Sequence, residues 1–206
     1  MRGVLITFEG VEGAGKTTQM LRLAHRLKRE GYRVERTAEP DGTPLGVAIR
    51  HMFERAATRP QPLGEVFLFM AARRQHVVEK IRPWLREGRI VLCDRYTDAS
   101  VAYQGYGRGI DRDLIRDLNV RATGGVLPDL TLVFDLPPLE GLRRICGRRL
   151  DLFERQTLAF HRRVRRGYLD ILRAEPKRMR LIRALRPPDR VAADVAMMVE
   201  DYLRAL

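Results

Sequence analysis

A glycine-rich segment near the start of the chain ends in a lysine and a threonine. Residues 10–17 read Gly-Val-Glu-Gly-Ala-Gly-Lys-Thr, which matches the phosphate-loop pattern Gly-x-x-x-x-Gly-Lys-Thr. Loop amides and the N-terminus of a following helix present positive dipoles to an anion. Lys16 can reach the β- and γ-phosphates of a nucleotide, and the Thr17 hydroxyl can ligate Mg²⁺. We therefore predict a nucleotide site formed by Gly10, Val11, Glu12, Gly13, Ala14, Gly15, Lys16, Thr17 and Thr18.

A second pair of charged residues, Asp94 and Arg95, directly follows a short apolar segment. Open α/β sheets bind ligands at the carboxyl ends of their strands. An aspartate there can hold Mg²⁺ through water or accept a proton, and an arginine can grip a phosphate with two parallel hydrogen bonds. An isolated pair of this kind can equally be a salt bridge at a strand end. Beside a phosphate-binding loop, we favour catalytic roles for Asp94 and Arg95.

The elements that must position these residues alternate between apolar strands and amphipathic helices. We expect strands at residues 4–8, 33–37, 89–93, 130–135 and 179–182. We expect helices at residues 16–30, 45–55, 64–86 with a kink at Pro83, 111–123, 139–148, 153–173 and from 189 onward, and a glycine-rich loop at residues 105–109. The alternation predicts one α/β domain over residues 1–206, with a doubly wound, parallel, five-stranded sheet covered by helices on both faces.

The composition argues against several classes of protein. Of the 206 residues, 45% are hydrophobic and 32% are charged, which is enough apolar material for a folded core. No apolar run approaches about 18 residues and the first residues lead directly into a strand, so we expect neither a membrane span nor a secretory signal. The two cysteines, Cys93 and Cys146, cannot form a disulfide framework and lack metal-ligand spacing, which favours a reducing, cytoplasmic location.

The strongly basic charge balance suggests a polyanionic partner. The formal net charge is +13, from 39 basic and 26 acidic residues. Only four of the basic residues are lysines, however, and the arginines are scattered over every expected helix without a cluster of stacking aromatic residues. We therefore do not expect nucleic acid as the main partner, because small anions such as nucleotides account for the charge equally well.

Several segments together resemble the bacterial thymidylate kinase family. They are Phe8-Glu-Gly-Val-Glu-Gly-Ala-Gly-Lys-Thr-Thr18, Glu39-Pro-Asp-Gly-Thr43, Phe69-Met-Ala-Ala-Arg73, Asp94-Arg-Tyr96, Ser100-Val-Ala-Tyr-Gln-Gly105 and Gly107-Arg-Gly109. The resemblance covers nearly the whole chain in order. It implies a P-loop NTPase-type fold with a helical lid at about residues 139–155, a homodimer, and transfer of a phosphoryl group from ATP to dTMP with Mg²⁺, as required for dTTP synthesis.

The resemblance assigns a pyrimidine site to two predicted helical segments. Phe69 and Arg73 lie four residues apart and share a helix face, so the ring can stack on a base while the guanidinium donates to a base carbonyl. Ser100 and Gln104 repeat this spacing, and the amide of Gln104 can donate to and accept from a base edge. Tyr103 can pack against the sugar and exclude a 2′-hydroxyl. Ordinary packing or helix-surface roles are the alternative for these residues.

The resemblance also assigns contacts to the acceptor sugar and phosphate. Glu12 resembles the acidic residue that contacts the 3′-hydroxyl, and Arg50 and Arg95 resemble arginines that hold the acceptor phosphate. Glu39 belongs to the acceptor loop and is assigned to substrate binding. The alternatives are a solvent-exposed loop carboxylate for Glu12 and a helix-surface position for Arg50.

The predicted lid raises the question of which arginine neutralises the transferred phosphoryl group. Relatives whose phosphate loop lacks arginine place a catalytic arginine in the lid, which makes Arg148 and Arg149 the candidates. A basic, solvated helix face is the alternative. The chain departs from the family pattern at Leu152, where the lid motif has arginine, and at Ala38, Asp41 and Arg183. These departures concern the lid, the acceptor loop and the adenine side.

Other functions remain as alternatives. A deoxynucleoside kinase would act on an uncharged 5′-hydroxyl, and Arg50 and Arg95 argue against it. A basic, nucleic-acid-binding NTPase and a nucleotide-binding regulator without catalysis are the other two. The four histidines show no ligand pairing, and we expect surface or helix-packing positions for His25, His51, His76 and His161.

Overall fold

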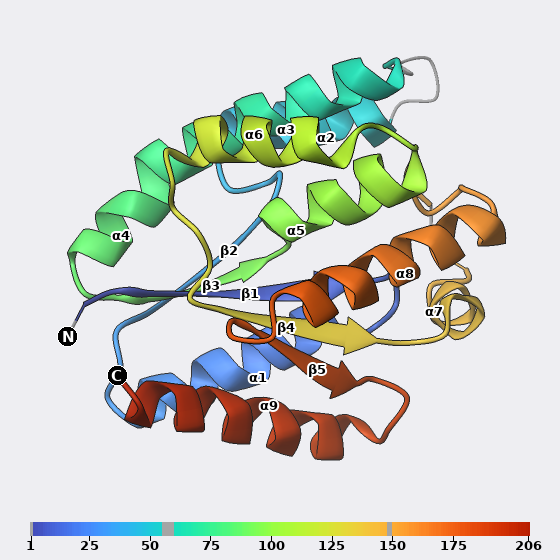
Figure 1. The fold of residues 1–206 in the computed structure, drawn as a ribbon. Coiled ribbons are helices and arrows are strands. Elements are labelled where there is room, and N and C mark those ends of the chain that lie inside the picture. The colour runs from blue at the N-terminus through green and yellow to red at the C-terminus, as the bar shows by residue number, and fades with distance from the viewer. Residues whose placement is uncertain (1, 55–59, 148–149) are drawn as a thin grey trace.

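A parallel sheet of five strands forms the centre of the molecule (Figure 1). The computed structural model describes residues 2–54, 60–147 and 150–206. The strands are β1 (Val4–Gly10), β2 (Val34–Ala38), β3 (Ile90–Asp94), β4 (Leu130–Asp135) and β5 (Met179–Arg183). Their order is β2-β3-β1-β4-β5, and all neighbouring strands are parallel. The prediction of a five-stranded parallel sheet is confirmed.

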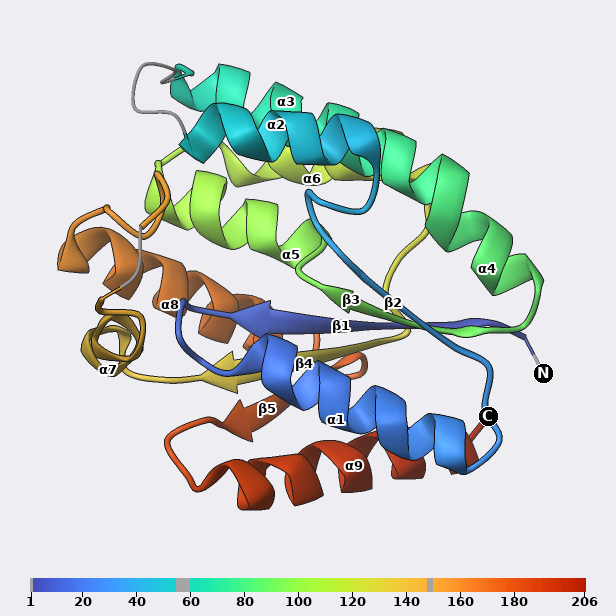
Figure 2. The same cartoon turned by 180° about the vertical axis from the view of Figure 1, so that it is seen from behind.

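Helices cover both faces of this sheet, as Figures 1 and 2 show. One face carries α1 (Lys16–Arg29) and α9 (Pro188–Arg204). The other face carries α2 (Pro44–Glu54), α3 (Pro62–His76), α4 (Arg82–Arg86), α5 (Thr97–Ser100), α6 (Arg112–Thr123) and α8 (Leu158–Ala174). The short helix α7 (Pro138–Arg144) follows β4. Because both faces are covered, β1 is buried along its whole length, which explains its continuous apolar sequence.

The register of the strands brings three loops together at the carboxyl edge of the sheet. Asp94, the last residue of β3, pairs with Phe8 on β1 and with Ala38 on β2. The loops that follow β1, β2 and β3 therefore leave the sheet side by side. The two chain termini lie at the opposite edge (Figure 1).

The glycine-rich segment predicted as a loop is helical for most of its length. Residues Val101–Gly107 form a π-helical segment, η2, that continues directly from α5, so the prediction of a loop beginning at residue 105 is wrong. Gly107 packs so closely against α8 that a Cβ atom there would lie 2.6 Å from the Phe160 ring. The glycine serves close helix packing, and this tertiary contact overrides its usual preference for loops.

The long helix predicted for residues 64–86 is divided into three parts. Helix α3 begins at Pro62, a wider π-helical turn η1 spans Val77–Ile81, and α4 continues from Arg82. Pro83 has no N–H to donate to the preceding turn. The change in winding thus comes immediately before Pro83, instead of a simple kink at that residue.

The helices predicted around the lid are shorter than expected. Helix α7 ends at Arg144 instead of reaching residue 148, which lies outside the described residues. Helix α8 begins at Leu158 instead of residue 153, because the Thr157 side chain caps it by accepting a hydrogen bond from the Phe160 amide. Asp151 instead accepts from the amides of Phe153 and Glu154, which fixes a turn before α8.

The described helices can be compared with the length and apolar character that a bilayer span requires. Within residues 2–54, 60–147 and 150–206, no helix is both long and apolar enough to span a bilayer. The largest apolar cluster joins both faces of the sheet and includes Phe8 and Phe134, whose rings stack at 5.8 Å.

Candidate functional site

A pocket of about 480 Å³ opens at the carboxyl edge of the sheet. Its walls come from the loops after β1, β2 and β3, from α2, α3 and η2, and from residues between α7 and α8. Most of the predicted site residues line it: Glu12, Gly13, Ala14, Gly15, Lys16, Thr17, Thr18, Glu39, Arg50, Phe69, Arg73, Asp94, Arg95, Ser100, Tyr103 and Gln104. Gly10 and Val11 lie at the start of the loop and do not line the pocket wall.

Lys16 is the cation of the phosphate-binding loop and lies at the start of α1. Its ammonium donates to the backbone oxygens of Gly10 at 3.1 Å and Val11 at 2.9 Å. Burial and the neighbouring Arg95 lower the pKa of Lys16. Because these two partners are neutral carbonyl oxygens, the ammonium can exchange them for phosphate oxygens at little electrostatic cost.

The phosphate-binding loop packs directly on helix α7. Gly13 has a left-handed conformation (φ 67°), and a Cβ atom there would lie 2.2 Å from the Gly141 carbonyl oxygen. A Cβ atom at Gly141 would in turn lie 2.1 Å from the Glu12 carbonyl oxygen. Only glycine fits at both positions, so the loop and the first helix of the predicted lid are held together by backbone contact.

Thr17 and Asp94 place two oxygen atoms side by side near the loop. The Thr17 hydroxyl donates to Asp94 Oδ2 at 2.6 Å, although the residues lie on α1 and at the end of β3. Hydroxyl and carboxylate oxygens suit Mg²⁺, which usually keeps several waters and takes few protein ligands. The described residues contain no cluster of three or more His, Cys, Asp or Glu side chains suited to a metal ion. A site in which phosphates and water supply most ligands fits this arrangement.

Arg95 lines the pocket and has an uncommon backbone conformation. Its φ is 67°, the left-handed region that non-glycine residues rarely adopt. Its guanidinium donates to Glu12 Oε2 at 2.7 Å and lies over the Tyr103 ring at 4.7 Å. Burial opposes ionisation of Glu12, but Arg95 and Lys16 more than offset it and lower the pKa of Glu12 to about 2. Glu12 is thus a buried, ionised partner of Arg95 and not a solvated loop carboxylate.

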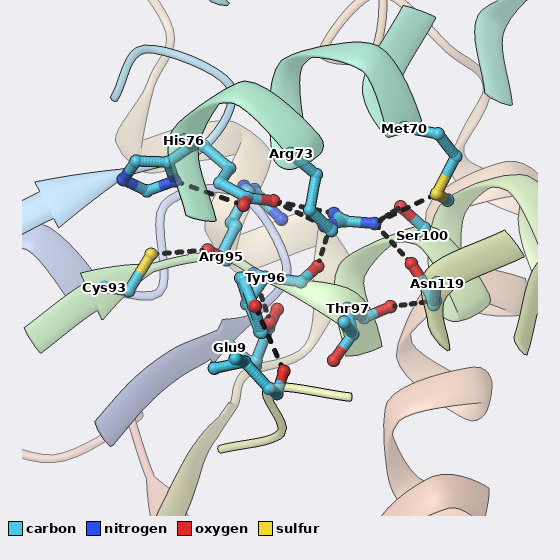
Figure 3. A network of polar contacts seen from close by, with 12 residues as sticks. Glu9, Met70, Arg73, His76, Cys93, Arg95, Tyr96, Thr97, Ser100 and Asn119 are labelled. Carbon is cyan, nitrogen blue, oxygen red and sulfur yellow. Dashed lines mark hydrogen bonds and ion pairs between the residues drawn. The ribbon is translucent and has the colours of Figure 1, made fainter. Parts of the chain in front are cut away.

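Glu9 supports the turn at Arg95 from inside the sheet. It accepts from the amide of Tyr96 at 2.7 Å and from the hydroxyl of Tyr168 at 2.8 Å, and Tyr168 in turn accepts from Arg95 at 3.4 Å. Burial and the nearby Asp98 raise the pKa of Glu9 to about 7. Figure 3 shows Glu9 beneath Tyr96.

Arg73 is fully buried, and protein atoms accept from all of its nitrogen atoms (Figure 3). Nε and Nη2 donate to Glu39 at 2.8 and 2.7 Å, and Nη2 also donates to the Tyr96 carbonyl at 2.9 Å. Nη1 donates to Ser100 Oγ at 3.0 Å and to Asn119 Oδ1. All five N–H groups therefore have acceptors. A base carbonyl, the predicted partner of Arg73, would have to share one of them.

His76 lies on the far side of the same network. One ring nitrogen is 3.2 Å from Glu39 Oε1, and the other is 2.7 Å from the Thr37 hydroxyl. Burial opposes ionisation of Glu39, but Arg73 and His76 more than offset it and lower the pKa of Glu39. The sequence interpretation of His76 as a surface or helix-packing residue missed this bridge to Glu39. His161, also buried, packs against Phe160.

Aromatic rings form the apolar part of the pocket. Phe69 stacks on Phe53 with ring centroids 5.1 Å apart and an interplanar angle of 11°. Phe153, from the turn before α8, meets both rings at 5.7 to 5.8 Å and meets Tyr103 edge-on at 5.8 Å. The Tyr103 hydroxyl donates to Glu12 at 2.6 Å. The rings of the predicted base site thus contact the predicted lid directly.

Arg50 is engaged by carboxylates at the rim of the pocket. It bonds Asp41 at 2.9 Å and Glu54 at 3.2 Å, with its side chain 43% exposed. Asp41 occupies one of the positions where the chain departs from the family pattern, and burial raises its pKa. An acceptor phosphate would have to compete with Asp41 for Arg50, so this departure bears directly on the predicted role.

The predicted lid arginines, Arg148 and Arg149, lie outside the described residues. Leu152, which replaces the lid arginine of the family pattern, is half-buried and packs against the apolar core. Arg144 on α7 is described, and it donates to the carbonyls of Gly13 at 3.2 Å and Ala184 at 3.4 Å.

The residues that sequence reasoning missed are mostly partners of those it found. They include Glu9, Glu65, His76, Arg108, Asn119 and Tyr168. Glu9 and Arg108 belong to the segments at residues 8–18 and 107–109 that carry the resemblance, which was the available signal. Glu65, His76, Asn119 and Tyr168 belong to no such motif.

Comparisons with known proteins show the family to which the chain is similar. A family model described as Thymidylate kinase matches residues 8–195. The chain is 47% identical to thymidylate kinase from Deinococcus radiodurans over 97% of this chain and 98% of that protein. It is also 47% identical to thymidylate kinase from Nitratidesulfovibrio vulgaris over 98% of each chain. The crystal structure of thymidylate kinase from Ehrlichia chaffeensis superposes with a TM-score of 0.79 at 36% identity, covering 97% of this chain and 99% of that one.

Proposed function

The chain belongs to the thymidylate kinase family, and from this premise we propose that it transfers the γ-phosphoryl group of ATP to the phosphate of dTMP. The products are ADP and dTDP, on the route to dTTP. One observation carries the proposal: the same pocket is lined by the phosphate-binding loop, by Arg95, and by a polar and aromatic wall suited to a base. Phosphoryl transfer needs little bond chemistry from side chains, so alignment and charge neutralisation dominate.

On the donor side, the loop residues 10–17 and Lys16 would hold the triphosphate. The N-terminus of α1 directs backbone amides toward this place, and Lys16 supplies a positive charge beside them. The ammonium would leave the carbonyls of Gly10 and Val11 for phosphate oxygens. Positive charge placed there is most stabilising in the transition state, because negative charge then spreads over the transferred phosphoryl group.

Mg²⁺ fits the donor set at Thr17 and Asp94. The hydrogen bond between their oxygens brings a hydroxyl and a carboxylate together at the edge of the loop. We propose that Thr17 holds the ion directly and Asp94 holds it through water. Mg²⁺ held by these residues would supply positive charge that offsets the negative charge developing on the phosphates.

On the acceptor side, Arg95 would hold the phosphate of dTMP. Glu12 and the strained backbone fix the guanidinium beside the loop, and Glu9 supports the turn. Glu12 stays ionised and would accept from the 3′-hydroxyl of the sugar. Tyr103, bonded to Glu12, would pack beside the same sugar and exclude a 2′-hydroxyl.

A direct product assay separates this proposal from the alternatives. The protein is incubated with ATP, Mg²⁺ and either dTMP or thymidine, and ³¹P NMR follows the nucleotides. When dTMP is the acceptor, we expect ADP and dTDP to form. When thymidine is the acceptor, we expect no dTMP to form. Phosphorylation of thymidine would instead indicate a deoxynucleoside kinase. ATP hydrolysis that needs single-stranded DNA and no monophosphate would indicate a nucleic-acid-dependent NTPase.

We further propose that the protein is a homodimer that works in the cytoplasm. Helices α2, α3 and α6 form one layer (Figures 1 and 2) and carry exposed apolar side chains, among them Leu45, Met52, Phe67 and Val120. A second copy would cover them. Sedimentation equilibrium should give twice the chain mass of 23.8 kDa, and Phe67→Glu should shift it toward the monomer. The thiols of Cys93 and Cys146 are free, which supports a reducing compartment.

A further inference from the structure

Gln104 presents its side-chain amide to the pocket in one fixed orientation. The residue lies on η2, lines the pocket and is 2% exposed. Its Nε2 donates to Glu65 Oε1 at 2.8 Å. Glu65 is itself buried, and its other oxygen accepts from Arg108 Nη2 at 3.2 Å. A carboxylate only accepts hydrogen bonds, so Gln104 must turn its NH₂ group toward Glu65.

This orientation leaves the carbonyl oxygen of Gln104 as an acceptor. Among the residues that the structure describes, nothing donates to this oxygen. Arg108 keeps the Glu65 carboxylate in place because the guanidinium of Arg108 is itself held by other contacts. It donates to Gln156 at 3.0 Å and lies over the Phe160 ring at 5.2 Å. The segment at residues 107–109 thus acts on the base site through Glu65.

Ser100 presents the opposite polarity on the same wall. Its oxygen accepts from Arg73 Nη1 at 3.0 Å, and Ser100 also lines the pocket. A hydroxyl that accepts from a guanidinium keeps its own hydrogen to donate. Because Arg73 cannot accept, Ser100 offers a donor and Gln104 an acceptor, one helical turn apart.

We propose that Glu65, held by Arg108, is a positioning residue that sets pyrimidine specificity by fixing the polarity of the Gln104 amide. The proposal rests on the function above and deepens it. In a thymine ring, N3–H would donate to Gln104 Oε1 and the adjacent C4 carbonyl would accept from Ser100. A cytosine ring carries an acceptor at N3 and an amino donor at C4. The acceptor N3 would then face the acceptor oxygen of Gln104, and the amino donor would face the donor hydroxyl of Ser100. Each mismatch leaves a buried polar group without a partner.

Glu65→Gln tests this inference because it changes hydrogen-bond polarity with little change of shape. The single oxygen of the new amide would turn to Arg108, which can only donate. Its NH₂ group would then face Gln104 and turn the Gln104 amide over. The matched ligands are dTMP and 5-methyl-dCMP, which share the methyl group and differ only at N3 and C4. We expect the ratio of their kcat/KM values to fall by roughly 100-fold, partly through a gain on 5-methyl-dCMP.

Three further variants separate specificity from packing. Glu79→Gln removes a charge from an exposed site on η1 and should leave the ratio unchanged. Gln104→Met should lose activity on dTMP without a gain on 5-methyl-dCMP, and adding Glu65→Gln to it should not change the ratio further. Glu65→Asp keeps an acceptor-only group, so the ratio should stay within about threefold of wild type even where both kcat/KM values fall.

The outcomes are distinct. An unchanged ratio in a folded Glu65→Gln, with a native KM for ATP, would overturn the inference. A large fall in the ratio of kcat/KM values for dTMP and 5-methyl-dCMP in Glu65→Asp would overturn it as well. The Glu65→Asp measurement is the deciding test if Glu65→Gln does not fold. Failure of the proposed function is separate, because the wild-type protein would then show no activity on dTMP.

Discussion

The two sides of the pocket hold their charged groups in different ways. On the base side, Arg73 is fully buried and donates to oxygen acceptors on four residues, Glu39, Tyr96, Ser100 and Asn119. On the phosphate side, Lys16 donates to the backbone carbonyls of Gly10 and Val11 in its own loop. On the base side, the charged group therefore has its hydrogen-bond partners before any ligand binds. On the phosphate side, a ligand's phosphate oxygens can replace the carbonyl partners of Lys16.

This difference follows from what each side must do. Discrimination between bases requires that donors and acceptors keep fixed orientations, and buried partners fix them. Phosphate recognition requires positive charge at the right place, and a lysine supplies it with few geometric demands. We therefore expect substitutions on the base side to cost stability and those on the phosphate side to cost turnover.

Arg73→Met should produce the largest effect and should appear in stability. It removes the ion pair of the buried Glu39 carboxylate and leaves His76 as its partner among the described residues, a loss of about 3–5 kcal/mol in unfolding free energy. Urea denaturation of wild type and variant measures it, with the exposed neighbour Arg74→Met as the control. A loss below about 1 kcal/mol would show that the network does not depend on Arg73.

Lys16→Met should show the opposite pattern. Removing the cation should lower kcat by roughly 10²- to 10³-fold, because the charge is needed most as the phosphoryl group is transferred. The unfolding free energy should change little, because no carboxylate is left unpaired. Steady-state kinetics and urea denaturation test both parts, with the exposed Lys28→Met as the control on the same helix. Near wild-type turnover would contradict the assignment of the phosphate-binding loop.

Glu9 should make stability depend on pH. Its pKa of about 7 in the folded protein exceeds the usual 4.5, so between these pH values the folded state holds its proton more tightly than the unfolded state. Unfolding free energy should then fall as pH rises from about 4.5 to 7, by roughly 3 kcal/mol in total, and this contribution should be constant outside that window.

Glu9→Gln removes that titration. The difference in unfolding free energy between variant and wild type should therefore change across the window in favour of the variant as pH rises. Urea denaturation at pH 5, 6, 7 and 8 measures the difference, in which other titrating groups largely cancel. A difference that stays flat with pH would show that Glu9 titrates at its ordinary value.

The lid arginines should have the smallest effect, because Lys16 remains in place. The double variant Arg148→Ala/Arg149→Ala should lose about 10- to 100-fold in kcat, with a smaller change in KM for dTMP. Arg143→Ala, which removes an exposed arginine that pairs with Glu140, is the matched control. Should the double variant keep its kcat, the missing positive charge must come from another residue.

Local patterns in the sequence were sufficient to predict the sheet and the phosphate-binding loop. Apolar runs marked β1, β3 and β4, and the alternation of strands and helices placed β2 and β5. Residues 10–17 form the phosphate-binding motif within one loop, so a local pattern was enough to find it. Gly107 shows where such reasoning fails, because its helical conformation depends on contact with Phe160 of a distant helix. The start of α8 similarly depends on the Thr157 cap and not on the apolar residue Phe153.

The partners within the site were beyond local patterns. Arg73 could be predicted from its spacing to Phe69, but its oxygen acceptors lie 23 to 46 residues away along the chain. His76 follows Arg73 on the same helix, yet its bridge to Glu39 exists only after β2 and α3 are placed together. Contacts of this kind depend on tertiary packing, which a single sequence does not display.

The central claim is that the pocket selects one pyrimidine monophosphate as acceptor, and initial rates of ADP release test it most directly. The wild-type protein is assayed with ATP and Mg²⁺ and with dTMP, dCMP, dAMP, dGMP or no acceptor. We predict rapid ADP release with dTMP, at a kcat/KM at least about 10²-fold above that of each other monophosphate, and little release without an acceptor. Equal release with all acceptors, or the same release with none, would contradict the account.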